Sequence, residues 1–303
     1  MSPETLRHEL FCARSLLQTD QDLSVPLSIG VGFLGWTLEL PDSQDVELLT
    51  IALDNHVKAV WFAFGDHTNR WLQLVRDHDQ RSGANRKTLV FVQISSLDEA
   101  EVAIRDWRVD VIVAQGSVLF CPSPGRTEFS SDAVITFLFP GIEAGGHGRS
   151  AAPPLLTLVP SIISVLPKPG PIFLAAGGLS HGAHVAAMLT LGVSGVVLGT
   201  RFLLTPESLY TDVQKNALIN ASSTVRTMAF DYVRDTLGWP SGVDGRALHN
   251  LTVEEFDKGV SLDQVKNRYS SEDPSRVVVW SGTGVALMSV IKPAKVCDRQ
   301  APY

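Results

Sequence analysis

The sequence has little of what marks several protein classes. Its 303 residues include three cysteines, Cys12, Cys121 and Cys297, which lie far apart and outside any CxxC or Cys/His pattern. Neither a metal site nor a disulfide framework is therefore indicated, and a reducing compartment is expected. The sequence has 25 Lys and Arg and 32 Asp and Glu, which gives a net charge of −7. This acidic balance argues against nucleic acid as the main partner. No uncharged apolar stretch reaches the roughly 18 residues of a membrane span, and the first residues carry no secretory signal. We expect a cytoplasmic protein with no membrane partner.

Short apolar runs alternate with longer amphipathic stretches along the first two thirds of the chain. Fully apolar strands separated by helices are typical of a parallel sheet that helices cover, so an α/β fold is expected. A parallel barrel and a doubly wound sheet both satisfy this pattern. We predict strands at 27–33, 59–64, 88–94, 111–114, 172–175 and 195–198, and helices at 4–18, 45–55, 69–80, 97–107, 155–166 and 181–191.

Residues after about 205 lose this alternation, and we interpret 205–303 as a helical lobe. Within it, 277–288 fits either a strand, turn and helix or a helix alone. We expect the polar side chains of Arg226, Asp231 and Arg234 to form a solvated helix face. Earlier in the chain, four aromatic residues suit the core better than a ligand pocket: Trp36, Trp61, Phe62 and Phe64.

Glycines follow two consecutive predicted strands. Ala-Ala-Gly-Gly-Leu-Ser-His-Gly (175–182) ends one strand and opens a helix, and Leu-Gly-Thr-Arg-Phe (198–202) ends the next. Glycine lets a ligand approach backbone N–H groups closely, and a helix N-terminus favours an anion. Barrels of the (β/α)₈ type build a phosphate site after their last two strands. A tight turn would explain either glycine pair alone, but both together favour a phosphate-bearing cofactor. The histidines of the first segment, His181 and His184, suit packing or solvent.

A third glycine-rich segment, Gly-Ile-Glu-Ala-Gly-Gly-His-Gly (141–148), contains His147. Between glycines, an imidazole can point into an open site, and it exchanges protons near neutral pH. The alternative is a glycine-rich turn with a solvated histidine.

These segments in this order, together with Gln-Gly at 115–116, resemble the nitronate monooxygenase family. The resemblance runs from about Pro3 to the end of the chain. It implies an FMN-binding (β/α)₈ barrel that oxidises alkyl nitronates, or nitroalkanes, with O₂ to a carbonyl compound and nitrite. His147 matches the active-site histidine, which takes the α-proton of a neutral nitroalkane or helps to hold the nitronate. The residues that match cofactor-binding positions are Gly32, Gln115, Gly145, Gly177, Gly178, Gly199 and Thr200.

The sequence departs from the family pattern at its start. The family begins with two strands that contact the flavin, and here no strand is predicted before residue 27. We therefore expect about six of the eight strands of a TIM-type (β/α)₈ barrel in 1–204, with the helical lobe 205–303 packed on it. Losing two strands opens sheet edges, so an inactive truncated chain unable to hold FMN is one alternative. A flavin-dependent enoyl reductase of the same fold is another.

A second departure separates Gln115-Gly116 from Gly141, whereas in the family Gln-Gly runs directly into Ile-Glu-Ala-Gly-Gly-His. Ser117 to Pro140 stand between them, and a loop of this length without clear structure is either functional or suspect. Its apolar run, 133–139, has no obvious place to pack. We consider two hypotheses: a translated intron retained in the coding sequence, or a lid over the site.

Overall fold

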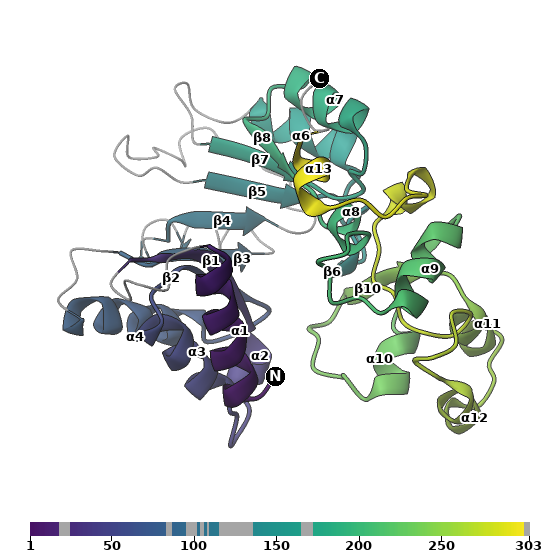
Figure 1. Cartoon of the computed structure of the whole chain (residues 1–303), viewed down its shortest axis with the longest axis horizontal. Coiled ribbons are helices and arrows are strands. Elements are labelled where there is room, and N and C mark those ends of the chain that lie inside the picture. The colour runs from purple at the N-terminus through teal and green to yellow at the C-terminus, as the bar shows by residue number, and fades with distance from the viewer. Residues whose placement is uncertain are drawn as a thin grey trace. The chain divides into compact units, whose positions relative to one another are not determined.

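The computed structural model describes residues 1–17, 25–82, 87–94, 102–103, 106–107, 109–114, 136–164 and 172–299. The chain forms two compact units, one built mainly of residues 1–113 and the other mainly of residues 136–303. Figure 1 labels most of the helices and strands of both.

The first unit is a sheet with helices against it. Its strands run in the order β1-β2-β3-β4, and the β1–β2 and β2–β3 pairs are parallel. Helices α1, α3 and α4 lie along one side of β1, β2 and β3 (Figure 1). The elements are α1 (Pro3–Leu16), β1 (Leu27–Leu34), α2 (Gly35–Leu38), α3 (Asp45–Asp54), β2 (Val57–Ala63), α4 (Thr68–Arg81), β3 (Leu89–Ile94) and β4 (Val111–Ala114).

Helix α1 shows why these segments form where they do. Ser2 caps it by accepting the N–H of Thr5, and Pro3 follows at the first turn, where a missing N–H costs nothing. Leu6 and Leu10 are buried one turn apart, so the helix presents one apolar stripe to the unit.

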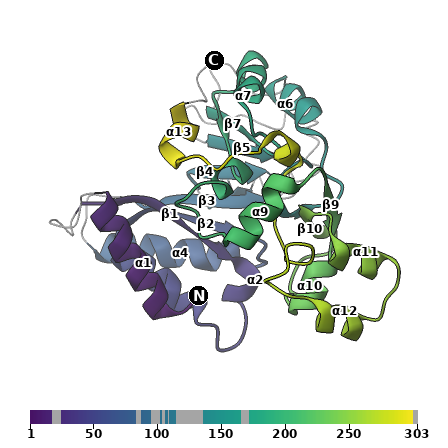
Figure 2. The same cartoon turned by 45° about the vertical axis from the view of Figure 1, so that its right-hand side comes forward.

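The second unit contains three further parallel strands. Its strands β5, β7 and β8 follow each other in that order, with parallel pairing throughout. Helices α6 and α7 lie beside them (Figure 2). The elements are β5 (Thr136–Pro140), α6 (Leu155–Ile163), β7 (Ile172–Ala176), α7 (Gly182–Thr190), β8 (Gly195–Val197) and α8 (Thr200–Leu203).

Strand β5 corrects one expectation about the long segment between Gly116 and Gly141. Its apolar run was expected to have no place to pack, but Thr136 to Pro140 pair with Ile172 to Ala176 of β7. Strand β7 therefore supplies backbone hydrogen-bond partners along one edge of this stretch. The rest of that segment, 117–135, lies outside the described residues.

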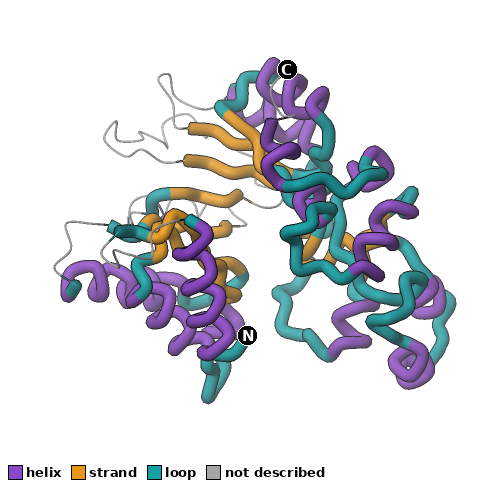
Figure 3. The backbone as a smooth tube through the Cα atoms, in the orientation of Figure 1, coloured by secondary structure: helices purple, strands orange, loops and turns teal. Residues whose placement is uncertain are grey.

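A three-stranded antiparallel sheet completes the second unit, in the order β6-β10-β9. Figure 3 draws its strands in orange among the helices of residues 205–299. The expected helical lobe therefore needs a correction, because it supplies two strands that pair with Gly146–Arg149. The elements are β6 (Gly146–Arg149), α9 (Asp212–Asn220), β9 (Thr224–Thr227), α10 (Ala229–Arg234), β10 (Val243–Leu248), α11 (Leu251–Asp257), α12 (Leu262–Arg268), a 3₁₀ helix η1 (Thr283–Leu287) and α13 (Ala294–Arg299).

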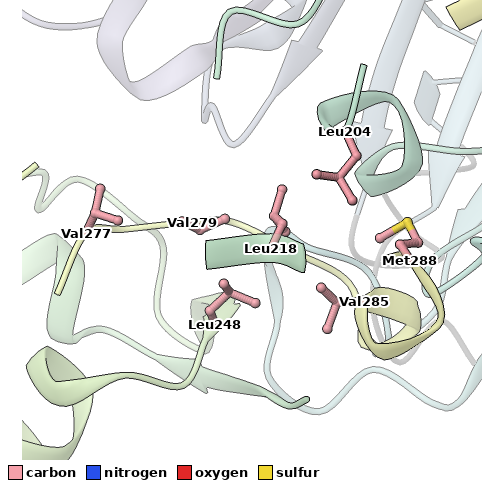
Figure 4. Packing of buried hydrophobic residues seen from close by; sticks show 7 residues of the cluster. All are labelled: Leu204, Leu218, Leu248, Val277, Val279, Val285 and Met288. Carbon is pink, nitrogen blue, oxygen red and sulfur yellow. The ribbon is translucent and has the colours of Figure 1, made fainter. Parts of the chain in front are cut away.

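One apolar cluster joins α8, α9, β10 and the segment before and through η1 (Figure 4). Leu204, Leu218 and Val279 in it are completely buried. The segment that fitted two interpretations, 277–288, is extended up to a bridge at Trp280 and then forms η1. The other buried members of the apolar cluster are Leu248, Val277, Val285 and Met288.

Most predicted strands and helices are confirmed within two residues at their ends. The predicted helix 97–107 falls largely outside the described residues. Phe62 is buried in the core as expected, and its ring stacks on Phe33 with centroids 6.0 Å apart. The parallel α/β architecture is confirmed, and closure into a barrel stays a prediction. In the described part of the chain, no helix has the length and apolar character needed to cross a membrane.

Candidate functional site

His147 lies on strand β6, in register with Gly245 of β10. The preceding Gly146 has φ +78°, a backbone conformation that favours glycine. A Cβ at Gly245 would lie 2.7 Å from Cη2 of Trp280, so glycine is needed there for the indole to lie against the strand. The segment around His147 is thus part of a sheet. The His147 side chain is only 11% exposed. The alternative of a solvated histidine in a turn is wrong.

The imidazole of His147 lies between two indole rings. Trp239 stacks on one face, with ring centroids 3.6 Å apart and planes within 9° of parallel. Trp280 contacts the ring at a centroid distance of 4.6 Å and a tilt of 58°. Such packing restricts the imidazole to one orientation.

A buried carboxylate faces the same imidazole. Nε2 of His147 lies 3.0 Å from both Oδ1 and Oδ2 of Asp231, and the Asp231 side chain is 1% exposed. Thr236 donates its hydroxyl to Oδ1 at 2.9 Å, and the indole N–H of Trp239 donates to the same oxygen at 3.0 Å. Burying a carboxylate is costly unless donors surround it, and here they do.

This arrangement assigns the protons of a neutral His147. A carboxylate accepts hydrogen bonds, so Nε2 carries the hydrogen and the lone pair lies on Nδ1. The carboxylate also balances the positive charge that the ring gains when it accepts a proton. The pair can therefore act as a base with a fixed orientation.

Asp231 and Arg226 do not belong to a solvated helix face, and that expectation was wrong. Asp231 points inward from α10, where Phe230 and Val233 are also buried. Arg226 donates to the carbonyl of Gly148 at 2.5 Å, and its side chain is 12% exposed. Sequence reasoning missed Asp231 and Trp239 as site residues.

The two glycine-bearing loops after β7 and β8 have the backbone freedom expected of an anion site. Gly177 and Gly178 have φ values of +110° and +67°. At Gly199 a Cβ would meet open space. The Ser180 hydroxyl beside them is buried and has no hydrogen-bond partner among the described residues. A buried hydroxyl without a partner is costly, and a ligand oxygen would satisfy it.

The segment before η1 ties these loops to the loop that leads into β6. Gly282 donates its N–H to the hydroxyl of Thr200 at 2.9 Å, and Thr283 donates its N–H to the carbonyl of Glu143 at 3.0 Å. A Cβ at Gly178 would lie 2.7 Å from Oγ1 of Thr283. The predicted catalytic and phosphate segments therefore share one packed support.

Glu143 fixes the start of the loop that leads into β6, the strand of His147. Both of its carboxylate oxygens lie 3.0 Å from the N–H of Leu155, the first residue of α6. A carboxylate at a helix N-terminus satisfies an unpaired N–H and interacts favourably with the helix dipole. Nearby, burial lowers the pKa of the Arg246 guanidinium, and the charge of Arg226 adds to this effect.

The other predicted residues divide by location. Gly145 packs against the backbone of Ser281 and Gly282 within the second unit, whereas Gly32 belongs to β1 of the first unit. Gln115 lies outside the described residues. His181 is exposed and caps α7 by accepting the N–H of Ala183 at 3.2 Å, which agrees with the expectation that it packs or faces solvent. Among the side chains that the structure describes, no His, Cys, Asp and Glu group could hold a metal ion.

The family model of nitronate monooxygenase matches residues 34–296 of the chain. A nitronate monooxygenase of Metarhizium robertsii is 30% identical over 324 aligned residues, which cover 99% of this chain and 80% of the relative. A nitronate monooxygenase of Neurospora crassa is 29% identical, covering 95% of this chain and 74% of the relative.

Solved structures resemble the fold. FabK from Thermotoga maritima has a TM-score of 0.63 and 21% identity, covering 99% of this chain and 80% of that one. Nitroalkane oxidase from Streptomyces ansochromogenes has a TM-score of 0.58 and 22% identity, covering 98% of this chain and 74% of that one. At these identities the likeness concerns the fold alone.

Proposed function

Because the chain belongs to the nitronate monooxygenase family, we propose that it is an FMN-dependent oxidoreductase that oxidises alkyl nitronates with O₂ to a carbonyl compound and nitrite. The observation that carries the proposal is the buried pair of His147 and Asp231, with Nε2 3.0 Å from the carboxylate. A base held in this way suits removal of a proton from the carbon beside a nitro group.

The loops after β7 and β8 suit the phosphate of FMN. Gly177 and Gly178 have positive φ values, and the Ser180 hydroxyl is a buried donor without a partner among the described residues. We propose that these residues, with Gly199 and Thr200, hold the phosphate. When bound, the flavin supplies the redox chemistry, taking electrons from the nitronate and passing them to O₂. The family resemblance also suggests Gly32, Gln115 and Gly145 as flavin contacts.

The proton step belongs to the chain's own residues. His147 takes the α-proton of a neutral nitroalkane on Nδ1, the electron pair of the broken C–H bond stays on the substrate as the nitronate, and Asp231 stabilises the imidazolium. A preformed nitronate has already lost this proton. His147 is therefore needed more for a nitroalkane than for its nitronate.

The test begins with the purified full chain titrated with FMN. Flavin fluorescence quenching and a yellow, monodisperse complex are the expected results. Nitrite release is then measured with an alkyl nitronate, with an enoyl thioester plus NAD(P)H as the competing substrate. A chain that stays colourless contradicts the cofactor assignment, and turnover of the thioester instead of the nitronate contradicts the substrate.

Two histidine variants complete the test. His147→Ala should lower turnover of a neutral nitroalkane by about 10²- to 10⁴-fold, the usual contribution of a general base. The matched control is His249→Ala, because the His249 side chain is 39% exposed on the way into α11. Equal activity of the two variants would remove His147 from the mechanism.

A further inference from the structure

Trp239 contacts both members of the His147–Asp231 pair. Its indole N–H donates to Oδ1 of Asp231 at 3.0 Å, and its ring lies face to face with the imidazole at 3.6 Å. The residue belongs to the connection between α10 and β10, well apart from β6 in the chain. One rigid side chain thus holds the carboxylate and the imidazole at the same time.

The two contacts act on different properties of the base. The hydrogen bond fixes the carboxylate oxygen that faces Nε2, and so maintains the tautomer with its lone pair on Nδ1. The parallel stack prevents the imidazole from turning about its χ2 angle, and an indole face also attracts a positively charged ring. Trp280 contacts the imidazole too, at a tilt of 58°, but no hydrogen bond to Asp231 accompanies that contact.

We propose that Trp239 is a positioning residue for proton abstraction: it holds Asp231 and the imidazole together so that Nδ1 of His147 presents its lone pair to the substrate. The proposal rests on the proposed function, because it concerns the same base. It assigns Trp239 to the proton step and not to binding of the nitronate or the cofactor.

Two variants separate the contacts. Trp239→Phe keeps an aromatic ring on the imidazole but removes the N–H donor, whereas Trp239→Leu removes both. Phe256→Leu is the matched control, because Phe256 stacks on Tyr232 at 5.6 Å in the same part of the chain without a described contact to His147. All three are compared for thermal unfolding, so that a folding defect is recognised.

The activity readout is the ratio of turnover on a neutral nitroalkane to turnover on its preformed nitronate. We expect Trp239→Phe to lower the nitroalkane kcat by about 10-fold and Trp239→Leu by more, a part of what a general base contributes. Turnover of the nitronate should stay within about twofold. Equal losses on both substrates in Trp239→Phe and Trp239→Leu would show a merely structural residue and overturn the proposal.

A second readout does not depend on activity. The ¹⁵N shifts of the His147 ring, assigned by comparison with His147→Ala, report which nitrogen carries the hydrogen. The wild-type ring should be protonated on Nε2, and Trp239→Leu should show a mixture of tautomers. An unchanged tautomer in Trp239→Leu overturns the positioning role. Two results together would separate the proposals. If wild type turns over neither substrate, the proposed function fails. If the tautomer still changes between wild type and Trp239→Leu, the positioning role of Trp239 remains supported.

Discussion

Gly245→Ala should destabilise the chain through a single new methyl group. The added Cβ would lie 2.7 Å from Cη2 and 3.2 Å from Cε3 of Trp280, whereas carbon atoms pack at about 3.5–4.0 Å. The indole must therefore move by roughly 1 Å. The indole cannot move freely, because the ring centroids of His147 and Phe230 lie 4.6 Å and 5.9 Å from the centroid of Trp280.

Overpacking of this kind costs about 1–3 kcal/mol, which lowers the Tm of a unit of this size by about 2–10 °C. Chemical denaturation followed by tryptophan fluorescence measures the cost, and near-ultraviolet circular dichroism reports displacement of the indole. The effect on the proposed enzyme should be larger on nitroalkane than on nitronate turnover, because the displaced ring contacts His147.

A double-mutant cycle supplies the control. In a Trp280→Leu background the clash is gone, and Gly245→Ala should then be neutral or stabilising by up to about 1 kcal/mol, because alanine loses less backbone entropy than glycine in a strand. The same destabilisation in both backgrounds would refute the argument, since it would show that the indole is not what excludes a side chain at Gly245.

Three further predictions concern other parts of the chain. Asp231→Ala should lower the free energy of unfolding by about 3–5 kcal/mol because buried donors lose a charged acceptor, and Asp231→Asn should cost less in the same denaturation assay; equal costs would contradict this account. Hydrogen bonding from Arg276 lowers the pKa of Glu255 from its usual 4.5, so stability that is present above pH 4.5 should be lost as the pH falls through the folded-state pKa. In a plot of the free energy of unfolding against pH, Glu255→Gln should reduce this loss at acid pH. An unchanged loss in the variant would exclude this carboxyl as its cause. Sequencing of the transcript tests the retained-intron hypothesis, which requires a spliced message joining Gly116 directly to a segment like Ile-Glu-Ala-Gly-Gly-His-Gly; a message that always encodes the intervening residues would eliminate it.

Local patterns in the sequence were enough to place most strands and helices. Apolar runs such as 27–33 and 88–94 became β1 and β3, because a short apolar run between helices is itself the pattern of a strand in a parallel sheet. Strand β5 was missed because its apolar run follows a long segment that matches no expected element. Short β9 and β10 were missed because antiparallel pairing with β6 depends on residues far away in the chain.

The candidate site was predicted only in part from the sequence. His147 stood out by its glycine neighbours, but Asp231 lies 84 residues further along the chain. Its partnership with the histidine arises from the fold. One signal was present: Asp231 is the acidic residue of a short helix whose Ala229, Phe230 and Val233 are apolar and buried. An acidic side chain among buried neighbours needs hydrogen-bond donors, and that requirement could have prompted a search for a basic partner.

The pairing of β6 with β10 has a consequence for how such chains can vary in length. Side chains on a strand alternate between two faces, so a shift of one residue in β6 would turn His147 away from Asp231 and Trp239. A shift in β10 would replace Gly245 opposite His147 by a residue whose side chain meets Trp280. Single-residue insertions and deletions should therefore be excluded from 146–149 and 243–248 in any active homologue. The connection 249–250 and the exposed turn at 258–260 impose no such register, and lineages of this protein can lengthen there without moving the base.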